Sequence, residues 1–111
     1  MKYSERDEGP FRVIALTGEV DMCDSPQARK QILKALNARN HVLVDLSDVE
    51  YIDSSGIASL VEGYQLARKH NLEFGLVGVS EAAMRVLQLA RLDQVFPIHG
   101  SVGERLQQQG D

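Results

Sequence analysis

Two adjacent serines near the middle of the chain are the side chains best placed to do chemistry. They lie in the segment 49–57, which reads Val-Glu-Tyr-Ile-Asp-Ser-Ser-Gly-Ile, after a predicted buried strand and at the predicted start of a helix. Free backbone N–H groups and the helix dipole at such a position favour a negative group by about 0.3–1 kcal/mol at exposed sites. A phosphate on Ser55 would therefore be tolerated there while changing the charge that the surface presents.

The same residues also fit a purely structural role. Asp53 or Ser54 can accept backbone N–H bonds as an ordinary helix cap, with Ser55 merely following. Gly56 has no side chain, and we expect it to leave room for a partner's backbone to approach. Residue spacing alone leaves both the cap and the phosphorylation site open.

Acidic residues gather around this segment. Between positions 40 and 67 there is no Lys or Arg, and the acids are Asp45, Asp48, Glu50, Asp53 and Glu62. Parallel strand pairing would bring Glu19, Asp21 and Asp24 close to them. Such a rim suits a partner with a basic face, and a phosphate within it would repel acidic groups opposite. A solvated loop face is the alternative, because exposed charges contribute little individually.

The sequence contains little that indicates a catalytic or a metal-binding site. A nucleophile elbow needs glycine two residues before the serine, where Asp53 stands, and the sequence contains no phosphate-binding GxxxxGK[ST] loop. The histidines are scattered and the single cysteine, Cys23, is expected to be a small, partly buried side chain. We therefore expect no enzyme activity, no metal and no cofactor.

Composition narrows the remaining classes. The chain has 111 residues, a formal charge of −4, 43% apolar residues and 25% charged residues, which is typical of one folded domain spanning 1–111. The acidic balance argues against direct nucleic-acid binding. No apolar run approaches the ~20 residues that cross a bilayer, and the N-terminal residues are too polar for a signal peptide. We expect a cytoplasmic protein without membrane insertion.

Alternating strand-like and helix-like segments must position the serines. Apolar runs bounded by turn residues predict strands, and apolar residues at i, i+3, i+4 and i+7 predict helices. The expected strands are 3–6, 11–17 with a short extension, 41–46, 73–79 and 95–98, and 47–53 is expected to be a loop. The first expected helix is capped by Asp24 and ends near 38, and the second begins near Ser54 or Ser55 and ends at about Lys69. The third is capped by Ser80 and ends near 90, and a short one follows Ser101. The residues expected to face the core are Ala28, Ile32, Ala35, Leu36, Ile57, Leu60, Val61, Tyr64, Ala67, Ala83, Val86, Leu87 and Ala90.

This order of elements predicts an α/β fold. Strands joined by helices pair in parallel through helical crossovers, while the first two strands can form an antiparallel hairpin. The expected architecture is a mixed sheet of four to five strands.

Several of these residues together resemble a known family. Leu16-Thr17-Gly18-Glu19-Val20-Asp21 ends one strand, 42–46 forms the central strand, Asp53-Ser54-Ser55-Gly56 opens a helix, and 74–79 precedes Ser80. With the segment from Met84 to Phe96, this pattern resembles a STAS domain of the anti-sigma factor antagonist type over roughly 11–100. One departure is Asp24, where many relatives place Thr; Asp caps a helix at least as well, but the extra acid could alter partner choice.

The resemblance implies a regulator that binds proteins. In such proteins the second serine of the motif, here Ser55, is phosphorylated by an anti-sigma factor that is itself a serine kinase. The unphosphorylated form binds that kinase and releases its target, and a PP2C-type phosphatase resets the cycle. Asp21 and Asp53 match the family's acidic residues that flank the serine, and they are expected to hold its environment and contact the partner. The partner-binding surface would also include Ser54, Gly56, Ala58, Ser59 and Glu62. We expect a monomer or weak dimer.

A second interpretation keeps the fold and changes the function. STAS-like chains also serve as accessory subunits of lipid-transport ABC assemblies. In that case the same helix face would bind the ATPase constitutively, without a phosphorylation switch.

Overall fold

Five strands form one mixed sheet in the computed structural model, which describes residues 1–108. The strands are β1 (Lys2–Glu8), β2 (Phe11–Val20), β3 (His41–Ile52), β4 (Phe74–Val77) and β5 (Ile98–His99), and their order in the sheet is β1-β2-β3-β4-β5. β1 and β2 pair antiparallel, and all other neighbours pair in parallel. The expected α/β class and N-terminal hairpin are confirmed.

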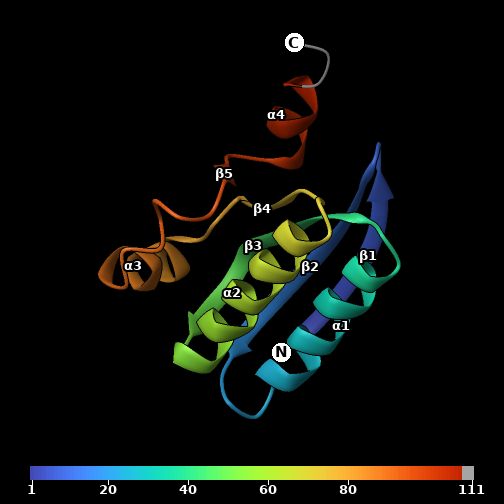
Figure 1. The fold of residues 1–111 in the computed structure, drawn as a ribbon. Helices are drawn as coiled ribbons and strands as arrows, with labels where there is room; N and C mark the ends of the chain where they lie inside the picture. The colour runs from blue at the N-terminus through green and yellow to red at the C-terminus, as the bar shows by residue number, and fades with distance from the viewer. Residues whose placement is uncertain (109–111) are drawn as a thin grey trace.

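Three helices make the crossovers that parallel strands require. They are α1 (Ser25–Asn37), α2 (Ser54–Lys69) and α3 (Glu81–Leu89). Figure 1 shows α1 and α2 side by side across one face of the sheet. α3 lies apart from them and packs against β3. The main core lies between these helices and the sheet, and it contains fully buried side chains such as Ile14, Leu36 and Leu60. Burying each such side chain contributes about 1.5–3 kcal/mol.

Most of the expected core positions are confirmed. The buried ones are Ala28, Ile32, Ala35, Leu36, Ile57, Leu60, Ala67, Ala83 and Leu87. Val61, Tyr64 and Val86 are half-buried and pack against the same core. Ala90 is exposed, because α3 ends one residue earlier.

The short helix α4 (Val102–Gln107) covers part of the opposite face. Val102 and Leu106 pack there on a second buried cluster made by Phe11, Val13, Leu43 and Val77. Arg105 forms an ion pair with Glu73, and its guanidinium lies 5.0 Å above the centre of the Phe11 ring. These contacts hold α4 over the end of the sheet where β2 begins.

The central strand is longer than expected. β3 continues through the segment 47–53, which we expected to be a loop, and ends at Ile52. Two irregularities in the pairing of β3 with β2 interrupt the alternation of apolar and polar residues along β3. The sequence of 47–53 therefore lacks the period of two that is typical of a strand. Val49 and Ile52 are buried in the main core, whereas the residues between them are exposed.

The last strand and the first helix cap also differ from expectation. β5 begins at Ile98 rather than Val95, because Phe96 turns inward and packs 5.6 Å from the Tyr64 ring. Asp24 makes no side-chain capping bond; its carboxylate instead lies 3.2 Å from the Met1 ammonium group. The expected caps Ser80 and Ser101 are confirmed by bonds from the backbone N–H groups three residues ahead.

Candidate functional site

The start of α2 is organised around one carboxylate oxygen. Oδ1 of Asp53 accepts the backbone N–H groups of Ser55 at 2.9 Å and Gly56 at 3.1 Å, and it also accepts the Ser55 hydroxyl at 2.5 Å. Asp53 is therefore the helix cap, as one interpretation of the sequence predicted. The Ser55 hydroxyl is part of the same arrangement; Ser55 as a residue is partly exposed, and Ser54 beside it is exposed.

The hydrogen bonds at this cap favour the charged form of the carboxylate. The pKa of Asp53 is lowered, first by the hydrogen bond from the Ser55 hydroxyl and then by the backbone N–H groups of Gly56, Ser55 and Met22; partial desolvation opposes them. Asp53 is consequently ionised at neutral pH. Because the ionised Asp53 carboxylate accepts a hydrogen bond from the Ser55 hydroxyl, the O–H bond points toward Asp53. The lone pairs of the Ser55 oxygen then remain available to another group.

The loop between β2 and α1 lies directly beside this cap. The backbone N–H of Asp53 donates to the Val20 carbonyl at 3.2 Å, which ties the start of α2 to the end of β2. Asp21 closes the loop: its Oδ1 accepts the N–H groups of Cys23 at 3.0 Å and Asp24 at 3.2 Å. The structure thus brings Asp21 and Asp53 to the same edge of the sheet, as the parallel pairing predicted.

Gly56 has a different role from the one we expected. It is buried, so the expectation that it leaves open space for a partner is wrong. A Cβ atom at this position would lie 2.7 Å from Cγ1 of Ile52, 2.9 Å from the Val20 carbonyl oxygen and 3.0 Å from Cγ1 of Val20. Glycine is required because α2 begins in close contact with β2 and β3.

The other expected surface residues of α2 divide into two groups. Ala58 is exposed, and Glu62 is half-buried with its carboxylate 2.6 Å from the Arg29 guanidinium on α1. Ser59 is only 5% exposed, so its expected place on the binding surface is wrong. Its hydroxyl donates to the Ser55 carbonyl at 3.1 Å and lies 3.3 Å from the Ser25 carbonyl, which fixes the first turn of α2 against α1.

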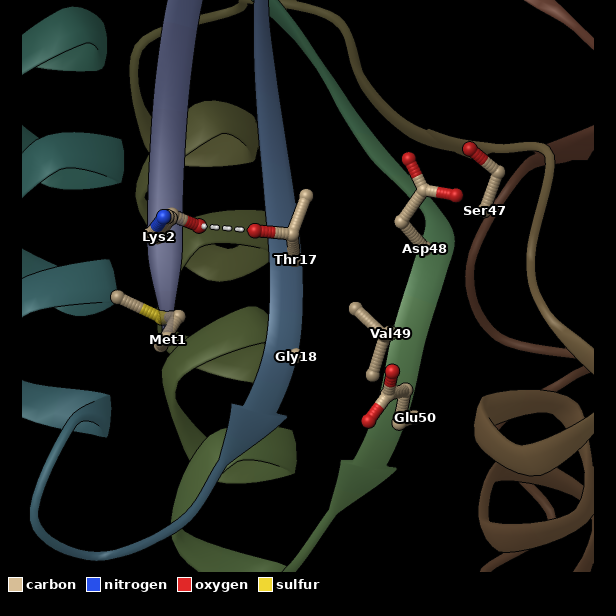
Figure 2. A pocket seen from close by; sticks show the side chains of 8 residues that line it. All are labelled: Met1, Lys2, Thr17, Gly18, Ser47, Asp48, Val49 and Glu50. Carbon is tan, nitrogen blue, oxygen red and sulfur yellow. Dashed lines mark hydrogen bonds between the residues drawn. The ribbon is translucent and has the colours of Figure 1, made fainter.

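A shallow cavity of about 690 Å³ lies on the face of the sheet that α1 and α2 leave open. Figure 2 shows Thr17 and Gly18 of β2 between Lys2 on one side and the acids Asp48 and Glu50 on the other. The Thr17 hydroxyl donates to the Lys2 carbonyl at 3.3 Å. This acidic face continues along β3 toward Asp53.

Two features of this region went unrecognised in the sequence. Met22 is 74% exposed in the loop beside Asp53, and the signal was an apolar residue in the loop between Asp21 and Asp24. Ser59 ties two helices together, and nothing in its spacing indicated that contact. Cys23, expected to be partly buried, is exposed.

Within residues 1–108, no three His, Cys, Asp or Glu side chains are grouped so that they could hold a metal ion. His41 accepts the Glu73 backbone N–H at 2.9 Å, which gives that histidine a structural role. Over the same part of the chain, no helix has the length and apolar character needed to span a membrane.

Proteins that are similar to this chain in sequence or structure include anti-sigma factor antagonists. An anti-sigma-B factor antagonist of Listeria monocytogenes is 26% identical over 106 residues, covering 94% of this chain and 91% of its own. The crystal structure of an anti-sigma factor antagonist from Mycobacterium paratuberculosis superposes with a TM-score of 0.85 at 26% identity, covering 99% of this chain and 94% of its own. The phosphorylated form of the Bacillus cell fate determinant SpoIIAA has the same fold, with a TM-score of 0.75 at 18% identity over 96% of this chain and 97% of its own. The family profile of the STAS domain matches residues 4–105, and the chain therefore belongs to the STAS domain family.

Proposed function

We propose that this protein is an anti-sigma factor antagonist controlled by phosphorylation of Ser55. In its unphosphorylated form it binds an anti-sigma factor that is also a serine kinase, and this binding releases the kinase's other target. A phosphate on Ser55 ends the binding, and a PP2C-type phosphatase restores it. The observation that carries the proposal is the partly exposed Ser55, whose hydroxyl donates to an ionised carboxylate at the start of a helix.

The cap geometry suits Ser55 as the acceptor of a phosphoryl group. The hydroxyl oxygen forms the new bond to the γ-phosphorus of ATP, the bond from that phosphorus to the β,γ-bridging oxygen breaks, and ADP leaves; a base of the kinase takes the hydroxyl proton. Asp53 orients the hydroxyl before transfer because it accepts the hydroxyl proton in a hydrogen bond of 2.5 Å. The lowered pKa of Asp53 makes it a weak base, so its role is to position Ser55.

Phosphorylation changes this edge of the molecule in two ways. The phosphoserine oxygen no longer carries the proton that binds Asp53, and about 1.5–2 negative charges are added next to an ionised carboxylate. Asp21 lies at the same edge and increases the local negative potential. A partner whose surface has closed over the neutral hydroxyl would meet both repulsion and added bulk.

The names of the relatives support the partner class. The Listeria and Mycobacterium proteins are called antagonists of anti-sigma factors, and their similarity extends over most of this chain. We propose a regulatory binding role without catalytic turnover.

The proposal is tested with tagged chain recovered from its native cells, followed by identification of the bound proteins and mapping of phosphate on the chain. We expect a serine kinase of the anti-sigma class and phosphate on Ser55. Ser55→Ala should bind that kinase without being modified, and Ser55→Asp should bind at least a hundredfold more weakly, about 2.8 kcal/mol. Ser4→Ala is the control, because it replaces an exposed serine on β1 rather than at the start of α2, and it should behave as the parent.

Three outcomes would contradict the proposal. The first is phosphate found only at a residue other than Ser55. The second is that Ser55→Asp and the phosphorylated chain both bind the kinase as tightly as the parent does. The third is that the recovered partner is a transporter ATPase and Ser55 is unmodified. The last outcome would favour the accessory-subunit interpretation.

A further inference from the structure

Two large exposed side chains lie on the two chain segments that meet at the Asp53 cap. Among residues 1–108, Met22 at 74% exposure and Tyr51 at 49% are two of five large hydrophobic side chains left exposed; the others are Tyr3, Leu89 and Val95. Tyr51 lies two residues before Asp53 on β3, and Met22 lies in the loop that packs beside Asp53. Apolar surface is therefore placed at an edge whose other side chains are mainly acidic.

The backbone holds Met22 in a fixed position. The Asp21 carbonyl accepts N–H groups from Asp24 at 3.1 Å and Ser25 at 2.7 Å, and the Asp21 carboxylate accepts two further N–H groups within the same turn. Met22 projects from this closed turn into solvent. A side chain presented on an ordered backbone loses little backbone freedom on binding, and the methionine side chain adapts to irregular apolar pockets.

Folding does not require methionine at this position. The hydrogen bonds of the turn involve backbone groups and the Asp21 side chain, and the Met22 side chain remains mostly in water. A polar residue would allow the same turn. Interfaces between proteins, in contrast, place Met and Tyr at their centre and charged groups around it.

We propose that Met22, assisted by Tyr51, is the apolar anchor with which the unphosphorylated chain docks on its serine kinase. The partner surface that fits is an apolar pocket edged by Lys or Arg side chains, which would face Glu19, Asp21 and Asp53. This inference rests on the proposed function and specifies the chemistry of the same docking surface.

The anchor also explains why a phosphate at Ser55 acts strongly. The Ser55 hydroxyl and the N–H groups of the cap bind the same Asp53 carboxylate oxygen, and the backbone N–H of Met22 also donates to the Asp53 carboxylate. A dianion there keeps water bound at the position that must be dehydrated when Met22 enters its pocket. Charge repulsion and loss of the apolar contact therefore act together.

The test measures binding of purified variants to the kinase that was recovered with the parent chain and phosphorylates Ser55. Met22→Gln keeps the length of the side chain and removes its apolar character; we expect binding at least tenfold weaker, about 1.4 kcal/mol. The KM for phosphorylation should rise by a similar factor while kcat stays unchanged, because the anchor binds substrate and transition state alike. Met22→Leu should restore parent binding, and Tyr51→Ser should weaken binding less than Met22→Gln.

Leu89→Gln is the matched control, because Leu89 is 82% exposed and lies at the end of α3. It should bind as the parent does, and thermal unfolding should show all variants equally folded. If Met22→Gln binds within twofold of the parent while Ser55→Asp binds weakly, the anchor is refuted and the proposed function stands. Equal losses from Met22→Gln and Leu89→Gln would also refute it. If no such kinase is recovered, the proposed function fails and this inference fails with it.

Discussion

Replacing Gly56 with alanine tests whether close packing fixes the start of α2. The added methyl carbon would lie 2.7 Å from a side-chain carbon of Ile52 and 2.9 Å from the backbone oxygen of Val20. The Ile52 side chain can shift, but the Val20 carbonyl belongs to β2 and accepts the N–H of Asp53. The first turn of α2 must therefore move away from the sheet.

The expected loss of stability follows from two opposing contributions. An extra carbon in a filled core costs about 1–3 kcal/mol. Alanine recovers up to about 1 kcal/mol because it favours the helical backbone more than glycine does. We expect a net loss of about 1–2 kcal/mol, which lowers the Tm by about 4–8 °C in a domain of this size.

Chemical and thermal unfolding of parent and Gly56→Ala measure this change. Gly103→Ala is the control: it also adds a methyl group within the first turn of a helix, but there the nearest contact is the Ser101 hydroxyl at 3.7 Å. That variant should be as stable as the parent or slightly more stable. If Gly56→Ala matches Gly103→Ala, close packing at the start of α2 is not a constraint.

Three further changes probe the cap and the cover of the sheet. Asp53→Asn should slow phosphorylation of Ser55, measured as an initial rate, because a neutral amide oxygen holds the hydroxyl less strongly; an unchanged rate would contradict the orienting role of Asp53. The pKa of Glu73 is lowered mainly by its hydrogen bond from Arg105, so its carboxylate stabilises the fold above the ordinary pKa and that contribution is lost as pH falls through the lower folded pKa. The Tm of Glu73→Gln should consequently decline less than that of the parent as the pH is lowered below about 4; parallel curves would show that the ion pair contributes nothing. Leu106→Ala should cost about 1–2 kcal/mol, less than a fully buried leucine, and should speed amide exchange in α4 more than in α1; equal exchange in both helices would mean that α4 is held by other contacts.

The sequence predicted those features that depend on residues within a single helix or strand. The alternation of strands and helices predicted the crossovers. The apolar spacing predicted α2 with a start at Ser54 or Ser55 and an end at about Lys69, and the helix spans Ser54–Lys69. The expected caps Ser80 and Ser101 bind within their own first turns, so their spacing was informative. Asp53 was recognised as a possible cap for the same reason.

Features that depend on contacts between distant segments could not be predicted. Asp24 has the residue type of a cap, but the nearby Met1 ammonium group binds its carboxylate. Gly56 was expected on an open surface because the residues next to it in the sequence do not indicate that Ile52 and Val20 pack against it. Ser59 follows the polar side of the helix pattern, yet its hydroxyl is buried beside α1.

The uneven pairing of β2 with β3 determines how the strand ends. From the pair Ala15–Asp45 to the pair Thr17–Asp48, β2 advances two residues while β3 advances three, and a second extra residue follows between Val49 and Tyr51. Two insertions restore the original alternation of side-chain direction, so that Ile52 points into the core. Deleting a single residue from 46–51 would turn Ile52 toward water, whereas deleting two would keep its orientation toward the core. Length variation in this strand among related chains should therefore occur in steps of two residues wherever the residue before the helix cap packs in the core.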